Sequence, residues 1–117
     1  MDFMRLLPFV ASAMLVACSS VADLRNQPAD VLLTSKKSPK QFAICFGDLI
    51  VNDGKLPFTA REINSGIQLV NVIDNKVYHV VDITSSDDMT DTMIKAHFSA
   101  WGAIVNSRYR DFLYECK

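Results

Sequence analysis

The sequence has no marked excess of charge of either sign, since 12 Lys and Arg residues stand against 13 Asp and Glu residues, for a net charge of −1. Such a balance provides no long-range attraction to nucleic acid or to anionic lipid headgroups, so we expect no nucleic-acid partner. The sequence also lacks G-x-S-x-G, Ser-x-x-Lys and phosphate-binding glycine-loop motifs. These absences predict a protein that is not an enzyme and that binds no cofactor.

Long hydrophobic runs are also missing. The longest apolar run, residues 6–17, is broken by Pro8 and Ser12, and at about a dozen residues it is too short for a permanent transmembrane helix. It follows a short segment that contains Arg5, as the apolar core of a secretory signal does. We therefore predict that residues 1–17 are a signal peptide and that the mature protein has no transmembrane span.

The apolar run ends in Leu15-Val16-Ala17-Cys18, which resembles the lipobox of bacterial lipoprotein precursors. The resemblance implies that Cys18 is lipidated after cleavage and that several acyl chains hold the protein stably in a membrane. Ser19 after the cysteine implies, for the same class, an outer-membrane protein that faces the periplasm. Two alternatives are an ordinary secretory signal that is cleaved after Ala17 and a cytosolic protein with an apolar N-terminus.

Residues 18–29 are mostly small or polar, include Asn26 and Pro28, and show no apolar periodicity. They are predicted to form a lipidated tether that reaches at most about 36 Å from the lipid when fully extended. Residues 30–117 are then sufficient for a single small domain with a modest core.

Only three cysteines are present, and assigning Cys18 to lipid leaves Cys45 and Cys116 in an oxidising compartment, where we expect them to form a disulfide. A bridge that closes a loop of about 70 residues adds on the order of 4 kcal/mol in the chain-entropy model. The alternative is a hydrolase in which Cys45 is a thiol nucleophile and His79 or His97 is the general base.

The sequence of the first part of the domain predicts a strand followed by a helix. The strand covers residues 31–35, and the helix is expected to begin at Pro39, with Ser38 as its cap and Gln41 completing a capping box. Gly54 is expected to end it. The apolar stripe of the helix consists of Phe42, Cys45, Phe46, Leu49 and Ile50.

From Phe58 the apolar period changes to two, which predicts antiparallel strands. Helical spacing returns at the C-terminus, so we predict an α+β fold of two layers, in the order β-α-β-β-β-α. About four antiparallel strands would form the sheet, and two helices joined by the disulfide would cover one face. The expected strands are residues 58–63, 67–73, 77–84 and, after a polar loop, 92–99, with turns at 64–66 and 74–75. The apolar side of the last helix consists of Trp101, Ile104, Val105, Tyr109, Phe112, Leu113 and Cys116.

Three features together resemble a group of small bacterial lipoproteins with a lipobox, a cysteine in each of two helices and a β-meander. They are the segment Thr34-Ser35-Lys36-Lys37-Ser38-Pro39, the cysteine at position 45 and the terminal Glu115-Cys116-Lys117. The resemblance implies the architecture and the location in the cell envelope. It implies no activity.

Metal binding is not expected. His79 and His97 could meet across two strands, but they have no partner at a metal-ligand spacing. Asp87, Asp88 and Asp91 lack the glycine and the spacing of a calcium loop. The acidic residues are therefore predicted to form a solvated loop.

Both faces of the predicted sheet are rich in apolar residues, and two helices can cover only one of them. A candidate partner surface on the other face consists of Val70, Val72, Tyr78 and Val80, which would bind another envelope protein or a second copy. The alternative is that the tether or the loops cover this face. The alternate set of residues would face solvent if the register were shifted by one.

The leading hypothesis is therefore a non-catalytic envelope lipoprotein that acts as a binding or structural accessory. The first alternative is a periplasmic inhibitor or small-ligand binder, and the second is the hydrolase that uses Cys45.

Overall fold

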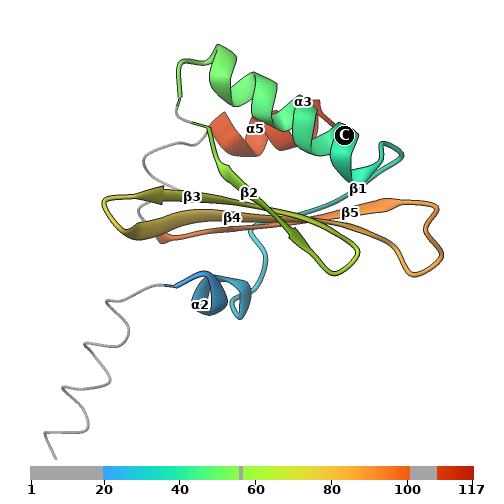
Figure 1. Cartoon of the computed structure of the whole chain (residues 1–117), viewed down its shortest axis with the longest axis horizontal. Helices are drawn as coiled ribbons and strands as arrows, with labels where there is room; N and C mark the ends of the chain where they lie inside the picture. Colours follow the sequence, from blue (N-terminus) through green and yellow to red (C-terminus); the bar gives the residue numbers. More distant parts are fainter. Residues whose placement is uncertain (1–19, 56, 101–107) are drawn as a thin grey trace, which may run out of the picture.

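Alternating apolar residues and tight turns build one antiparallel sheet, as a computed structural model shows for residues 20–55, 57–100 and 108–117 (Figure 1). All neighbouring strands are antiparallel, and the order across the sheet is β1-β5-β4-β3-β2. The strands are β1 (Val31–Ser35), β2 (Thr59–Ile63), β3 (Gly66–Ile73), β4 (Lys76–Ser85) and β5 (Thr92–Phe98).

The α+β class and the antiparallel sheet are confirmed, but the expected count of about four strands is wrong. The sheet has five strands, because β1 lies beside β5, with Leu33 opposite Ile94. These two strands are separated by α3 and the three-strand meander, so their pairing is a long-range contact. A period of two identifies a strand but does not identify its neighbour.

The turns follow from local chemistry. Asp74 and Asn75 both have a positive φ, of 52° and 63°, as the two-residue turn between β3 and β4 requires. The turn expected at residues 64–66 is shorter, because Gly66 already belongs to β3. A Cβ atom at Gly66 would lie 2.0 Å from the Ile83 carbonyl oxygen, so only glycine allows the two strands to approach so closely.

Helix α3 (Pro39–Asn52) begins as predicted. The Ser38 hydroxyl accepts a hydrogen bond from the Gln41 backbone N–H at 3.2 Å, and the Gln41 side chain accepts one from the Ser38 N–H at 3.1 Å. The helix ends before Gly54, whose φ is 77°. Its buried residues Phe42, Phe46 and Ile50 belong to the core on one face of the sheet.

Helix α5 (Arg108–Glu115) lies beside α3 on the same face of the sheet (Figure 1). It buries Tyr109, Phe112 and Leu113 in the core that α3 helps to form. Cys116, directly after α5, is bonded to Cys45 of α3, with 5.9 Å between the two Cα atoms. The predicted disulfide is therefore confirmed. The positions predicted at Trp101, Ile104 and Val105 lie outside the described residues.

The segment predicted to be the tether contains a third helix, α2 (Val21–Arg25), on the opposite face of the sheet (Figure 1). Ser20 caps it and forms a capping box with Asp23. Leu24 is only 1% exposed. The tether prediction is wrong for these residues, because a single leucine and a cap are sufficient for a short helix once the sheet provides a surface to pack against. Two helices were predicted, and the described residues contain three.

A chain of hydrogen bonds attaches α2 to three strands. Arg25 Nε donates to Asp82 at 2.8 Å, and the Gln68 amide donates to the other oxygen of the same carboxylate, also at 2.8 Å. Arg61 Nε donates to the Gln68 carbonyl oxygen at 2.7 Å. Gln68 and Asp82 are buried, so these bonds satisfy polar groups that would otherwise lose their hydration without compensation.

The predicted partner surface is not an open patch. Val80 is 0% exposed and Val70 is 9% exposed, because both lie on the face that α2 and its neighbouring residues cover. Val72, at 50%, is exposed, and Tyr78, at a bulge of β4 opposite β3, is partly exposed. The proposal that these four residues form a binding surface is therefore wrong for Val70 and Val80. The alternative, in which the N-terminal segment covers this face, describes the structure.

Arg25→Ala is expected to lower the free energy of unfolding by about 1–2 kcal/mol, because it removes a charge-assisted hydrogen bond to a carboxylate that is mostly buried. Urea unfolding measures the change. Lys36→Ala is the control, since its ion pair with Asp91 is exposed to solvent and its loss is expected to cost well under about 1 kcal/mol. Equal effects of the two substitutions would show that the Arg25 contact does not hold α2 to the sheet.

Candidate functional site

An apolar groove lies where α3 leaves the edge of the sheet uncovered. The helix packs over β3 and β4, while β2 is the edge strand beyond them. The groove between α3 and β2 has a volume of about 340 Å³, at the lower end of the range for ligand sites. Its lining includes Ala43, Ile44, Gly47 and Val51 of α3, together with Phe58 and Ala60. We call it the α3–β2 groove.

Two apolar side chains at the α3–β2 groove face solvent. Ile44 is 53% exposed and Val51 is 55% exposed. They are seven residues apart and therefore lie on one side of the helix, separated by two turns. Exposed apolar residues are ordinary when they are scattered, but a pair that lines a groove forms a surface on which an apolar group can lose its hydration.

Strand β2 forms the other wall of the groove and is an open edge. Residues Thr59, Ala60, Arg61 and Glu62 are all exposed, and no strand in the described part of the chain pairs with the outer side of β2. In an antiparallel pair, successive residues direct their N–H and C=O groups alternately toward and away from the partner strand. Ile63 and Gly66 close the two-residue turn to β3, so Ala60 and Glu62 are the residues whose backbone groups point outward.

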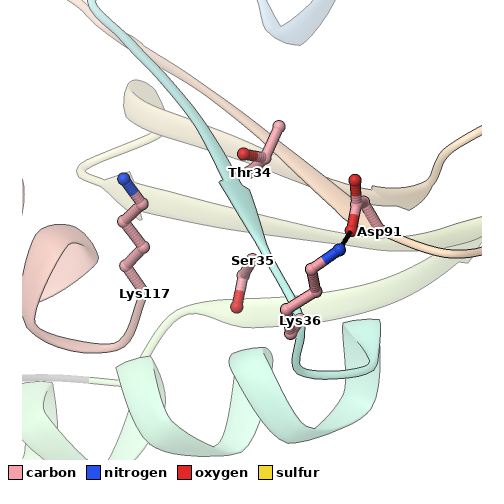
Figure 2. Close-up of a pocket in the computed structure, with 5 residues that line it drawn as sticks. All are labelled: Thr34, Ser35, Lys36, Asp91 and Lys117. Carbon is pink, nitrogen blue, oxygen red and sulfur yellow. Dashed lines mark hydrogen bonds and ion pairs between the residues drawn. The ribbon is translucent and has the colours of Figure 1, made fainter.

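A second hollow is polar and lies at the end of β1. It has a volume of about 430 Å³ and is lined by Thr34, Ser35, Lys36, Asp91 and Lys117. Figure 2 shows Lys36 reaching across to Asp91, while the Lys117 side chain lies on the other side of β1. The hydrogen bond to Asp91, together with the charge of that carboxylate, raises the pKa of Lys36. The two charges therefore compensate one another within the hollow.

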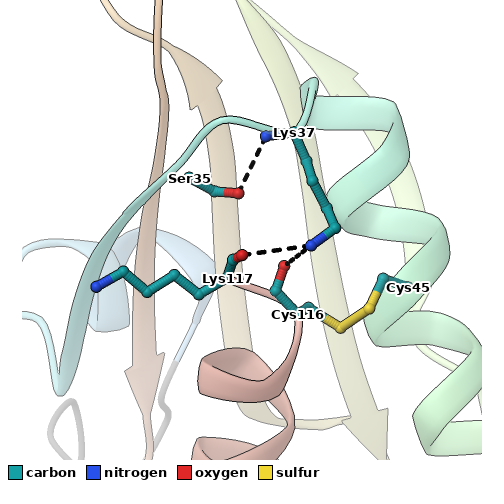
Figure 3. Close-up of a disulfide and its surroundings, with 5 residues drawn as sticks. All are labelled: Ser35, Lys37, Cys45, Cys116 and Lys117. Atoms are coloured by element: carbon teal, nitrogen blue, oxygen red, sulfur yellow. Dashed lines mark hydrogen bonds between the residues drawn. A yellow bond between two sulfur atoms is a disulfide. The ribbon is translucent and has the colours of Figure 1, made fainter.

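The segment from Thr34 to Pro39, on which the resemblance to small lipoproteins rests, has a structural role in this chain. Ser35 Oγ accepts a hydrogen bond from the Lys37 N–H at 3.1 Å, and Lys37 Nζ donates to the Cys116 carbonyl oxygen at 2.7 Å (Figure 3). Lys37 Nζ also donates to the Lys117 oxygen at 3.3 Å. Lys37 therefore binds the chain directly after α5, next to the disulfide.

The acidic loop after β4 forms its own hydrogen bonds. The Asp88 carboxylate accepts hydrogen bonds from the hydroxyl groups of Ser86 and Thr90, at 2.6 and 2.9 Å. These hydrogen bonds, of which the one from Ser86 has the largest effect, lower the pKa of Asp88 to about 2. Asp87 is exposed, and Asp91 pairs with Lys36 instead. Among the described residues, no three His, Cys, Asp or Glu side chains are arranged to bind a metal ion.

The two histidines do not meet. His79 lies opposite Phe98, on the face that carries α3 and α5, and its Nδ1 is 3.1 Å from the Asn71 side-chain oxygen. His97 lies opposite Val80 and therefore on the other face. The expectation that they could meet across strands is wrong, because residues of adjacent strands share a face only when their positions pair in register. Cys45 is bonded to Cys116 and has no free thiol to act as a nucleophile.

The predicted lipidation site, Cys18, lies outside the described residues, so its modification stays a prediction.

The α3–β2 groove was missed by sequence reasoning. Its signals are Ile44 and Val51, which fall outside the predicted apolar stripe of α3, and Gly47 between them. Apolar residues seven positions apart on a second side of an amphipathic helix indicate a second surface, but they do not show what lies beside it.

A comparison with models of known protein families, with curated proteins and with solved structures found no match. Within the part of the chain that the structure describes, no helix combines the length and the apolar character needed to span a bilayer.

Proposed function

We propose that the chain is a lipid-anchored protein of the bacterial cell envelope that acts as a non-catalytic binding accessory. The membrane is contacted through lipid on Cys18, in the outer membrane and facing the periplasm. The binding function belongs to the α3–β2 groove, where an apolar surface lies beside an open strand edge. That groove is the observation on which the proposed binding role rests.

The disulfide supports the proposed location. Bonds such as that between Cys45 and Cys116 form and persist in oxidising compartments, including the bacterial periplasm, and are rare in the cytosol. With the other two cysteines bonded to each other, Cys18 is the single cysteine left over. Its assignment to lipid therefore requires no further partner for its sulfur.

The position of α2 specifies how such a domain would be held. Ser20 caps α2, which lies against the sheet, and it follows Cys18 by two residues. Two residues span at most about 7 Å, so lipid on Cys18 would hold the domain directly at the bilayer surface. This placement supports an accessory for a membrane-associated partner more than a binder that explores the periplasm on a long tether.

Cys18→Ala is expected to abolish metabolic labelling with palmitate and to move the protein from the detergent phase to the aqueous phase or to leave it uncleaved. The physical reason is that acyl chains supply the affinity for the membrane. Ser19→Ala is the matched control, and it is expected to keep both the label and the detergent partition. Wild-type protein that carries no label and stays aqueous would contradict the proposed anchor.

A further inference from the structure

We propose that β2 binds an extended segment of a partner protein as an additional antiparallel strand, with an apolar side chain of that segment in the α3–β2 groove. The segment carries a basic, an acidic and an apolar residue in consecutive positions. The inference rests on the proposed binding role and specifies the chemistry of the partner.

The backbone of β2 is suited to such a strand. Ala60 and Glu62 direct their N–H and C=O groups away from β3, and both residues are exposed. An added strand pairs with these groups in the way that β3 pairs with Thr59, Arg61 and Ile63 on the inner side. Every strand pair in the sheet is antiparallel, and antiparallel pairing is also the slightly more stable arrangement.

Gly47 points to an occupant of the groove. Glycine is the least favourable residue apart from proline in a helix interior, yet Gly47 lies in the middle of α3. A Cβ atom at this position would meet nothing within 4 Å, so packing inside the domain does not require glycine. The missing side chain leaves space in the lining of the α3–β2 groove, where a side chain from a bound segment would approach the helix.

The charges on β2 specify the neighbours of that apolar side chain. Ala60 and Glu62 share the face that carries α3, since they pair with the core residue Leu69 and with Ile67, which packs against the core, whereas Arg61 lies on the other face, opposite Gln68. Opposite charges directly across two strands stabilise a pair, and like charges destabilise it. The bound segment therefore has a basic residue opposite Glu62, an acidic residue opposite Arg61 and an apolar residue opposite Ala60.

A second copy of the chain fits this edge less well. Two antiparallel β2 strands that pair through their outward groups over all five residues place Arg61 opposite Arg61. Such like-charge pairs oppose edge-to-edge association. The observations therefore favour a different protein as the source of the added strand.

The test uses the full chain in lipid nanodiscs and a short fluorescent peptide whose central residues are lysine, glutamate and leucine, in that order. The control peptide has glutamate, lysine and leucine. The first peptide is expected to bind about tenfold more tightly, because two cross-strand charge pairs change from attractive to repulsive. In the variant Glu62→Arg, which keeps the hydrogen bond from Arg61 to Gln68, the preference between the peptides is expected to disappear, because each peptide then forms one attractive and one repulsive charge pair. On binding, the amides of Ala60 and Glu62 are expected to gain protection from hydrogen exchange.

Gly47→Leu tests the groove separately from the charges. The leucine side chain occupies the space beside α3, so peptide affinity is expected to fall about tenfold or more, while the melting temperature stays the same or rises because leucine favours the helix. Arg110→Ala, on the exposed side of α5, is the control and is expected to keep the affinity.

Equal affinity for the two peptides, or none for either, would overturn the inference. Binding of a small apolar dye in the groove without any peptide binding would also overturn it and would assign the groove to a small ligand. The anchor is tested by palmitate labelling, so the two proposals fail independently. If the wild-type protein carries no lipid but still discriminates between the two peptides, the proposed anchor is disproved and the proposed added strand is supported.

Discussion

Cys45→Ser is expected to lower the free energy of unfolding by about 4 kcal/mol. The bridge links residues 71 positions apart. In the chain-entropy model, removing a bond that closes a loop of that length raises the conformational entropy of the unfolded chain and so stabilises the unfolded state. Four kilocalories per mole is roughly half of the stability of many small domains. Urea unfolding of the oxidised wild type and of the variant measures the difference.

Cys116→Ser should have a similar effect, and the double substitution should cost little more than either one alone, because both single changes remove the same bond. Thiol titration of unreduced, denatured wild-type protein is the accompanying control and should find neither Cys45 nor Cys116 free. Additive losses, or two free thiols, would show that the bridge is absent in the native protein.

Val80→Lys is expected to destabilise the domain by about 3–5 kcal/mol, which is again roughly half of the stability of many small domains. Val80 is fully buried, and a lysine there would either hold an unpaired charge out of water or force the covering segment away. The melting temperature and the urea midpoint measure the loss.

Val72→Lys is the matched control. Val72 lies two residues after Val70 on β3, on the same face, but is half exposed, so the same substitution should change the stability by no more than about 0.5 kcal/mol. A Val80→Lys protein that keeps its melting temperature would show that α2 leaves the sheet easily and that the covered face can open.

Local signals were sufficient for several elements. The Ser38 and Gln41 capping box, followed by apolar residues at helical spacing, predicted α3 from its first residue, and the Asp74-Asn75 pair predicted the turn between β3 and β4. Both rest on contacts between residues close in the chain, so a short window of sequence contains all the groups that take part. The cysteine pair was predicted from the count of cysteines and the expected compartment rather than from any local contact.

The candidate site was not predicted, for the converse reason. The α3–β2 groove exists because α3 crosses β3 and β4 and leaves β2 uncovered, and this offset depends on how the helix packs on the sheet. Ile44 and Val51 were visible as apolar residues outside the main stripe of α3. The sequence of the helix does not determine whether these two side chains contact a neighbouring element, face solvent or line a groove.

The amino-acid sequence therefore determined the α+β class, the antiparallel character of the sheet, the start of α3 and the pairing of Cys45 with Cys116. The tertiary structure decided the position of β1 beside β5, the cover that α2 provides for Val80 and the open edge at β2. The physical reason is the period of two in a strand, which groups alternate residues together but leaves both the neighbouring strand and the covering layer undetermined. Those choices depend on which surfaces, distant in the chain, remove the most apolar area from water together.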